Sequence, residues 1–435
     1  MNINIPVTNK PRVVIVGGGF AGLYLARALK GSDFQVVLID RNNYHTFQPL
    51  LYQVATAGLE PDSIAYPIRR VLQRYADGIF RLAEVSHIDA KEQRVETNIG
   101  SINYDYLVLA TGSTTNFFGL APVADQMMPM KSVPEALNLR SLLFQNFEKA
   151  LLTSDIHQRK AAMSVVIVGG GPTGVELAGA LAEMQRHVLP KDYPELDLRQ
   201  MEVHLFERAP RLLAAMSERS SAEAHGYLSK LGVKVWLDTA VDTYENNIAT
   251  LSNGNEVGTE TLIWAAGVRG QFPEGLDGEA ISGNRITVNE LAQVPGHANI
   301  YALGDVARMV TEEQPHGLPM LASVATQQGV WLGKNLKAMA RGKEPKPFVY
   351  KDKGSMATIG RNRAVVDLTR MHFSGMFAWF VWMFVHILLL VGFRNKAVTF
   401  IGWVWNYFTY DRSLRLIIRP FRRKVSSEHE FAKHV

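Results

Sequence analysis

Two short segments of this chain have the residue types and spacing that bind a dinucleotide phosphate. The first is Gly-x-Gly-x-x-Gly at residues 17–22, after the apolar run 13–16, and both features recur at 169–174 and 165–168. Glycines at this spacing allow a tight turn, bring the backbone close to a pyrophosphate and let the next helix pack on its strand. A single copy is often only a glycine-rich turn, but two copies after predicted strands indicate two dinucleotide sites. Two such sites on one chain indicate electron transfer between the two ligands.

An acidic residue ends the strand that is predicted to follow each glycine motif. Asp40 lies 18 residues after Gly22, where a carboxylate contacts ribose hydroxyls, although a solvated residue at a strand end is the alternative. Glu207 ends the corresponding strand of the second unit, and an inserted polar stretch at 189–200 explains its greater distance. A carboxylate repels a 2′-phosphate, so Glu207 favours NADH over NADPH, while the neighbouring Arg208 weakens that preference.

Further predicted strands return the chain to the two dinucleotides. Residues 104–112 and 261–267 are buried-strand patterns that end in a glycine turn, one in each half of the chain. Residues 300–305 form another strand that ends in Gly-Asp, where Asp305 can accept hydrogen bonds from ribityl hydroxyls. The alternative for Asp305 is a helix N-cap.

Composition limits the class of protein. The 435 residues are long enough for two or three domains, and 20% charged against 47% apolar residues indicates a globular chain. There is no cysteine, which excludes a disulfide framework and electron transfer through thiols and fits a reducing compartment. Residues 1–12 are polar, so we expect no secretory signal.

The C-terminal part differs from the rest in charge and aromatic content. Residues 371–393 and 397–410 contain no Asp, Glu, Lys or Arg, and 13 of the 41 aromatic residues fall in 371–410. Eight basic residues and one acidic residue lie from Arg394 to Lys424. These features favour helices lying in a membrane interface, with a membrane-spanning helix or a buried dimer interface as the alternatives. The basic residues fit anionic lipid better than nucleic acid, because no recognition module is present.

One further motif resembles a known family. Residues 43–55, Asn-Tyr-His-Thr-Phe-Gln-Pro-Leu-Leu-Tyr-Gln-Val-Ala, are similar to the signature of type II NADH:quinone oxidoreductases, and 354–360, Gly-Ser-Met-Ala-Thr-Ile-Gly, add to the resemblance. It implies an α/β, glutathione-reductase-like fold with two Rossmann-like dinucleotide-binding domains and a C-terminal membrane-anchoring helical region. The implied domains are 1–120 (FAD-binding, first part), 121–160 (connecting helical segment), 161–275 (NADH-binding), 276–345 (FAD-binding, second part, with the quinone-side helix) and 346–435 (membrane-associated region).

The resemblance also implies which residues bind the cofactors. FAD would be held by Gly17, Gly19, Gly22, Asp40, Gly112 and Asp305, and NADH by Gly169, Gly171, Gly174 and Glu207. The other expected cofactor-binding residues are Gly18, Phe20, Ala21, Arg41, Gln48, Val85, Ala110, Thr111, Gly170, Pro172, Thr173, Gly267 and Gly304.

Catalytic and quinone residues follow from the same resemblance. Glu176 matches the family glutamate near the nicotinamide and is the candidate catalytic residue, the alternative being an acidic residue favoured near a helix N-terminus. Relatives carry Ala-Gln-x-x-x-Gln before the anchor, whereas this chain has Ser323 in place of the first glutamine and Gln327 as the second, on one helical face. Gln328 and Lys353 complete the expected quinone site, and no metal site is expected.

The resulting expectation is a respiratory NADH:quinone oxidoreductase without proton pumping. It would pass a hydride from NADH to FAD and then two electrons to a membrane quinone, ubiquinone or menaquinone. Its other expected partners are the membrane surface, contacted by the C-terminal helices, and a second copy of the chain in a homodimer. We expect a monotopic protein on the cytoplasmic face of the inner (cytoplasmic) membrane. The alternatives are a soluble NADH-dependent reductase of a ferredoxin- or rubredoxin-like carrier, and a nucleotide-binding flavoprotein without turnover.

Overall fold

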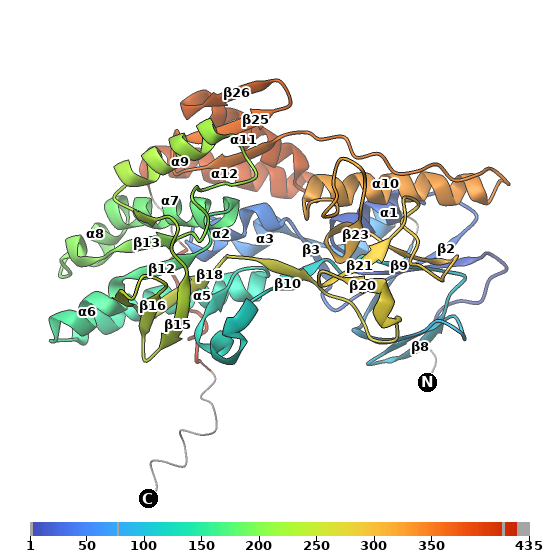
Figure 1. The fold of residues 1–435 in the computed structure, drawn as a ribbon, viewed down its shortest axis with the longest axis horizontal. Coiled ribbons are helices and arrows are strands. Elements are labelled where there is room, and N and C mark those ends of the chain that lie inside the picture. The colour runs from blue at the N-terminus through green and yellow to red at the C-terminus, as the bar shows by residue number, and fades with distance from the viewer. Residues whose placement is uncertain (1–2, 76–77, 411–413, 424–435) are drawn as a thin grey trace, which may run out of the picture. The chain divides into compact units, whose positions relative to one another are not determined.

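The computed structural model describes residues 3–75, 78–410 and 414–423. It divides into two compact units, each assembled from segments that are distant in sequence (Figure 1). Unit 1 contains residues 1–46, 65–114 and 268–353, and unit 2 contains residues 47–64, 115–267 and 354–435. The predicted C-terminal region 346–435 is therefore divided between the units, and the five predicted domain boundaries stay predictions.

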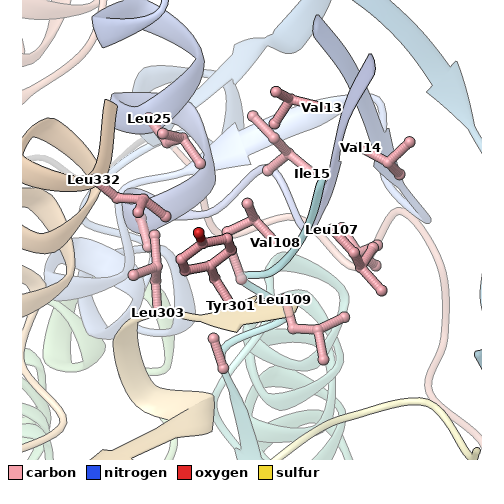
Figure 2. Close-up of a cluster of buried hydrophobic side chains, with 14 of the residues drawn as sticks. Val13, Val14, Ile15, Leu25, Leu107, Val108, Leu109, Tyr301, Leu303 and Leu332 are labelled. Atoms are coloured by element: carbon pink, nitrogen blue, oxygen red, sulfur yellow. The ribbon is translucent and has the colours of Figure 1, made fainter. Parts of the chain in front are cut away.

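Unit 1 is built on a five-stranded parallel sheet in the order β22-β9-β1-β2-β5. These strands are β1 (Arg12–Val16), β2 (Gln35–Asp40), β5 (Ile79–Leu82), β9 (Tyr106–Leu109) and β22 (Ile300–Ala302). Their apolar runs suit a sheet that is covered on both faces, as parallel sheets are. The buried side chains of β1, β9 and β22 form one core (Figure 2).

A close helix pair covers this sheet and fixes the predicted quinone-side helix. The two helices are α1 (Phe20–Ala28) and α10 (Ala322–Met339). A Cβ atom added at Gly329 or Gly333 would lie only 2.4 or 2.5 Å from atoms of α1, so the two glycines let the helices approach closely. Helix α10 is thereby held against the helix that follows the first glycine motif.

Shorter elements complete the chain around unit 1. They are β3 (Tyr44–Thr46), β4 (Ala65–Pro67), α4 (Ile68–Tyr75), β6 (Val85–Asp89), β7 (Arg94–Thr97), β8 (Gly100–Asn103), β10 (Ser113–Thr115), β19 (Val268–Gly270), η4 (Gly278–Ala280), β20 (Ile281–Ser282), β21 (Arg285–Val288), η5 (Gly304–Val306) and β23 (Ala307–Met309).

Unit 2 contains a second parallel sheet with an equivalent strand order, β11-β18-β12-β13-β14. Its strands are β11 (Met128–Pro129), β12 (Val165–Val168), β13 (Val203–Phe206), β14 (Lys234–Trp236) and β18 (Thr261–Trp264). In both sheets the strand before the glycine motif is central: β1 lies between β9 and β2, and β12 lies between β18 and β13. Asp40 ends β2, and Glu207 directly follows β13. The predicted α/β class with two Rossmann-like units is confirmed.

The other elements of this sheet domain are mostly helical. They are η1 (Gln48–Leu50), α2 (Leu51–Ala55), α3 (Pro61–Ile64), η2 (Phe118–Gln126), α5 (Val133–Leu152), α6 (Ile156–Met163), α7 (Pro172–His187), α8 (Leu189–Asp192), η3 (Leu198–Gln200), α9 (Glu218–Lys230), β15 (Val241–Glu245), β16 (Ile248–Leu251) and β17 (Glu256–Gly258).

The C-terminal part of unit 2 is a three-stranded antiparallel sheet followed by two helices. The strands are β24 (Ser355–Thr358), β25 (Ala364–Leu368) and β26 (Met371–Ser374), and the helices are α11 (Gly375–Leu389) and α12 (Phe393–Thr409). The charge-free run 371–393 is thus divided among a strand, a helix and a turn, in which Gly392 takes a positive φ of 88°. Among the described helices, none has the length and hydropathy required to cross a membrane.

Candidate functional site

The first glycine motif forms a tight loop between β1 and α1. Gly17 has a φ of +106°, and a Cβ atom there would lie 2.3 Å from the Ala110 carbonyl oxygen. A Cβ atom at Gly22 would lie 1.9 Å from the Gly17 carbonyl oxygen, so neither position accepts a side chain. At Gly19, in contrast, no atom lies within 4 Å of a Cβ position, so the loop is open at the N-terminus of α1. This is the geometry in which helix N-termini bind phosphate.

Asp40 holds this loop through the backbone. One carboxylate oxygen accepts the Gly18 amide proton and the other accepts the Asn42 amide proton, both at 2.6 Å. Burial raises the pKa of Asp40, and these two hydrogen bonds oppose that shift. The residue therefore positions the glycine loop in addition to its predicted contact with ribose.

The second glycine motif repeats this arrangement in unit 2. Gly169 has a φ of +111°, and a Cβ atom at Gly174 would lie 1.9 Å from the Gly169 carbonyl oxygen. The Glu207 carboxylate accepts the Gly170 amide proton at 2.5 Å and the Ala209 amide proton at 2.7 Å. The same acid-to-glycine contact thus forms twice, with aspartate in one unit and glutamate in the other.

A second part of the unit 1 site forms at the ends of β9 and β22. The Ser113 hydroxyl donates to the Asp305 carboxylate at 2.5 Å, and the Gly304 amide donates to the Gln328 side-chain oxygen at 2.7 Å. Leu303, not Asp305, is the N-cap of η5, so the capping alternative for Asp305 is not realised. Gly112, with a φ of +74°, has no atom within 4 Å of a Cβ position. Sequence reasoning did not identify Ser113.

His45 is a further residue of this loop to which sequence reasoning gave no role. It is buried, donates from Nδ1 to the Gly18 carbonyl at 3.0 Å and packs edge-on against Phe20. Burial lowers its pKa to about 4, so the ring is neutral near pH 7. Within the described part of the chain, its Nε2 atom has no hydrogen-bond partner. His45, which belongs to the 43–55 motif, thus supports the first glycine loop through the Gly18 carbonyl.

The unit 1 residues fit an FAD dinucleotide. The spaces at Gly19 and Gly112 are open where a Cβ atom would otherwise project, and Asp40 and Asp305 supply carboxylates for hydroxyl groups. The other predicted unit 1 positions are less distinctive, because Arg41 is exposed and Val85 is half-buried at the start of β6. Phe20, Ala21, Ala110 and Thr111 lie on the loops and helix just described.

Two predicted cofactor residues belong to unit 2. Gln48 is exposed in η1, and Gly267 accepts a hydrogen bond from the Asn116 amide at 3.0 Å. A Cβ atom at Gly267 would lie 2.8 Å from the Phe118 ring, which explains the need for glycine. Pro172 and Thr173 are exposed at the start of α7, beside the second glycine loop.

Glu176 lies in a cavity of unit 2. It follows the first turn of α7, which contains no acidic residue, so the helix dipole does not explain its position. The side chain is 7% exposed, and the Thr358 amide donates to its carboxyl oxygen at 3.4 Å. Burial raises the pKa of Glu176 to about 8, against the smaller opposing effects of Thr358 and Trp382. The group is therefore a carboxylic acid at neutral pH.

The walls of this cavity come from α2, α7, β24, α11 and α12, and its volume is about 100 Å³. Trp403 of α12 donates to the Gln53 side-chain oxygen at 2.8 Å. The Arg361 guanidinium donates to the carbonyl oxygens of Asn406 and Tyr407, at 2.6 and 2.8 Å, and so neutralises the C-terminal end of α12. These contacts attach the last helix to the cavity by polar side chains.

Residues 11–329 match the pyridine nucleotide-disulphide oxidoreductase family, and residues 353–410 match the NDH2 C-terminal domain. The chain is 34% identical to the type II NADH:quinone oxidoreductase Ndh of Mycobacterium tuberculosis, with 92% of this chain and 89% of that protein covered. It is 31% identical to an internal alternative NAD(P)H-ubiquinone oxidoreductase of Arabidopsis thaliana, covering 94% and 86%.

The chain belongs to the type II NADH:quinone oxidoreductases. The fold agrees with a solved structure of NDH2 from Plasmodium falciparum in complex with NADH, at a TM-score of 0.86 and 21% identity, covering 94% of this chain and 100% of that one. The predicted family is thereby confirmed, and flavin is the cofactor typical of that family. The chain has no cysteine, so it lacks the dithiol after which the wider family is named.

In this type II oxidoreductase the predicted quinone residues of α10 make internal contacts. The Ser323 and Tyr350 hydroxyls are 3.0 Å apart, and the Gln327 amide pairs with both backbone groups of Lys351, at 3.0 and 3.1 Å. Gln328 is 1% exposed and directed to Gly304. Gln327 and Gln328 therefore position the chain around them, whereas Lys353 is exposed.

The basic residues of the tail also differ from the expectation of a free patch. Arg415 forms an ion pair with Asp192, and Arg423 donates to Asn247 at 3.1 Å and to the Glu260 carbonyl oxygen. Lys424 lies outside the described residues. At least two of the predicted lipid-facing arginines thus bind other parts of unit 2.

Proposed function

We propose that this protein oxidises NADH and reduces a membrane quinone by way of FAD, without proton pumping. The observation that supports it is the duplicated acid-to-glycine contact, Asp40 with Gly18 and Glu207 with Gly170, in a chain that also has the NDH2 C-terminal domain. When bound, FAD would supply the redox chemistry: a flavin can accept a hydride from NADH and can pass electrons to a quinone.

The chain's residues bind and orient the reactants. In unit 1, the 17–22 loop, Asp40 and Asp305 would hold the pyrophosphate and hydroxyl groups of FAD, while Gln328 fixes Gly304. In unit 2, the 169–174 loop and Glu207 would hold NADH, and the carboxylate of Glu207 disfavours the 2′-phosphate of NADPH. Glu176 would hold a proton at its carboxyl oxygen beside the reacting groups. Ser323, Gln327, Gln328 and Lys353 stay the predicted quinone-side residues.

The amphipathic arrangement of α12 supports attachment to a membrane. Its buried residues include the polar Asn395 and Thr399, which face the protein, and Asn395 donates to the Asp62 carbonyl at 2.9 Å. Apart from Arg394 near its N-terminus, its exposed side chains are apolar: Phe393, Val398, Phe400, Ile401, Val404, Trp405 and Phe408. A helix with polar side chains inside and apolar side chains outside is suited to lipid contact.

The proposal therefore places the protein on a membrane surface, with α11 and α12 in the interface. Helix α11 adds Phe377, Phe380 and Phe384 to the exposed apolar face. The cytoplasmic face of the cytoplasmic membrane and a homodimer through the C-terminal part complete the prediction. Ubiquinone and menaquinone are both candidate acceptors.

Anaerobic mixing of the FAD-loaded protein with NADH tests the function. We expect rapid loss of the flavin absorbance, a slower loss with NADPH, and recovery when a ubiquinone or menaquinone analogue is added. Flavin that NADH does not reduce would contradict the proposal. Reoxidation by a ferredoxin- or rubredoxin-like carrier, but by neither quinone, would favour a soluble reductase instead.

A further inference from the structure

The surroundings of Glu176 contain a hydrogen-bond donor that the proposed reaction does not explain. The carboxyl group accepts one hydrogen bond, from the Thr358 amide at 3.4 Å, and no charged group among the described residues shifts its pKa. A buried carboxylate usually needs several donors or a cation. One further donor is therefore required if Glu176 is to ionise in place.

Trp382 of α11 lines the same cavity as Glu176 and carries a hydrogen-bond donor. Its side chain is 2% exposed, and its buried indole Nε1 atom has no hydrogen-bond partner among the residues that the structure describes. Buried N–H groups nearly always find an acceptor, because leaving one unpaired is destabilising. The same indole lines one cavity with Glu176 and Thr358, and it lowers the pKa of the carboxyl group. The cavity therefore contains both a buried donor without an acceptor and a buried acid with one backbone donor.

Neighbouring titratable groups are engaged elsewhere. Those that line the cavity with Glu176 are Tyr52, Glu183, Arg361 and Tyr407, and His386 stacks on the Trp382 indole. Arg361 donates its guanidinium to α12 and its backbone amide to Glu183. Tyr52 accepts a hydrogen bond from Gln53 at 2.8 Å. His386 donates to the Trp382 carbonyl at 2.7 Å, and burial lowers its pKa to about 4, so it is neutral.

We propose that Trp382 is a positioning residue for Glu176, whose indole N–H forms a hydrogen bond with the carboxylate when Glu176 loses its proton. Thr358 and Trp382 then form a two-donor cradle for the anion, in which hydrogen bonds are stronger than to the neutral acid. The step moves one proton, from the Glu176 carboxyl oxygen to water in the cavity, while the indole keeps its own. The use of that proton in quinone reduction rests on the proposed function, but the equilibrium itself needs no substrate.

Trp382 also connects the cavity of Glu176 with the two helices proposed to contact lipid. Trp382 belongs to α11, whose opposite face carries the exposed phenylalanines, and its ring packs on Trp403 of α12 with centroids 5.6 Å apart. The position of the indole is therefore set by the two helices that are proposed to contact lipid.

Infrared spectroscopy of the FAD-loaded full-length protein tests the proposal without substrate. We expect a protonated-carboxyl band that is absent in Glu176→Gln and that titrates near pH 8 in the parent protein. In Trp382→Phe the midpoint should rise by about one unit, because the anion loses a charge-assisted hydrogen bond. Trp379→Phe is the matched control, since Trp379 lines the same cavity from the same helix, and it should leave the midpoint unchanged. Equal midpoints in Trp382→Phe and the parent would overturn the proposal.

A second measurement covers the case in which Trp382→Phe does not fold. In protein labelled with ¹⁵N-tryptophan, one indole N–H resonance should move downfield with the same midpoint as the infrared band, and this movement should vanish in Glu176→Gln. Seven indole resonances that are all independent of pH would refute the inference. Failure of quinone reduction with an intact shift would instead contradict only the proposed function.

Discussion

At the scale of single residues, two carboxylates perform one positional task in two places. Asp40 and Glu207 each use one oxygen to bind the residue after the first glycine of the motif, Gly18 or Gly170. The other oxygen binds the backbone amide two residues after the acid itself. Charge-assisted hydrogen bonds of this kind hold a loop rigidly. The shape of each phosphate site thus depends on its acid as well as on its glycines.

Separate alanine substitutions should separate the two cofactor sites. Asp40→Ala should lose bound flavin during purification, because the 17–22 loop and the ribose both lose a carboxylate. Glu207→Ala should keep its flavin and raise the KM for NADH at least about tenfold, the loss of one strong polar contact. Flavin absorbance of the purified variants and steady-state kinetics measure the two effects. Loss of flavin in Glu207→Ala would contradict this assignment.

Glu176 should make the stability of the protein depend on pH. Its folded-state pKa of about 8 exceeds the ordinary value of 4.5, so the folded chain binds more protons than the unfolded chain between these values. The contribution to stability is complete below pH 4.5 and is lost as the pH rises toward 8.

The variant Glu176→Gln removes this dependence, because the amide does not titrate. Relative to the parent protein, its free energy of unfolding should therefore increase by about 3 kcal/mol between pH 5 and pH 8. Denaturant unfolding of both proteins at the two pH values measures this difference. A constant difference would mean that Glu176 is ionised in the folded protein throughout. In the absence of denaturant, quinone reduction by Glu176→Gln should be slower than by the parent protein.

At the scale of elements, α12 has the polarity opposite to that of a helix in a water-soluble protein. Asn395 and Thr399 are buried, Trp403 bonds to Gln53, and Arg361 caps the C-terminal end, so the helix is held by polar contacts. Its apolar side chains are left to face outward. The hydrophobic effect therefore drives this surface toward lipid, not toward the protein core.

Charges on that outer face should detach the protein from membranes. The double variant Ile401→Asp with Phe408→Asp should bind lipid vesicles at least about tenfold more weakly, because each carboxylate replaces an apolar contact with lipid and is costly to bury there. Vesicle flotation measures the bound fraction. Leu152→Asp, at an exposed apolar residue of α5, is the matched control and should bind as the parent does. Equal flotation of all three proteins would remove α12 from the proposed interface.

At the scale of the whole molecule, the net charge of +5 contributes less to surface binding than the tail composition indicates. Arg415 forms an ion pair with Asp192, and Arg423 donates a hydrogen bond to Asn247. The Arg394 guanidinium lies 3.4 Å from the Asp62 carboxylate. The exposed apolar side chains of α11 and α12 stay uncovered by other described parts of the protein. Attachment should accordingly depend mainly on apolar contact.

Salt should therefore change vesicle binding only slightly. Between low salt and about 0.5 M salt, where exposed charges are strongly screened, we expect the affinity for anionic vesicles to fall less than about threefold. Sedimentation with vesicles across a salt series measures this, with a short polylysine peptide as the control that salt releases. Complete release of the protein at high salt would show that the basic residues, and not the apolar face, hold it.

The amino-acid sequence by itself determined the features that depend on local structure. Two glycine motifs, the acids Asp40 and Glu207 and the parallel strands around them follow from short-range spacing, because strand, turn and helix patterns are complete within a few tens of residues. The apolar, aromatic tail is equally a matter of composition. The basic residues at 394–396 separated two charge-free runs in the sequence, but the break between α11 and α12 lies earlier, at 390–392, where Gly392 has a positive φ.

Tertiary structure decided which side chains meet. Only the fold brings Trp382 and Glu176 to one cavity, directs Gln328 to Gly304 and pairs Arg423 with Asn247. Backbone periodicity carries no record of these partners, because they depend on how distant helices and strands pack and on which buried polar groups then lack a bond. A carboxyl group that titrates near pH 8 is likewise a property of its surroundings in the fold, and not of its position in the chain.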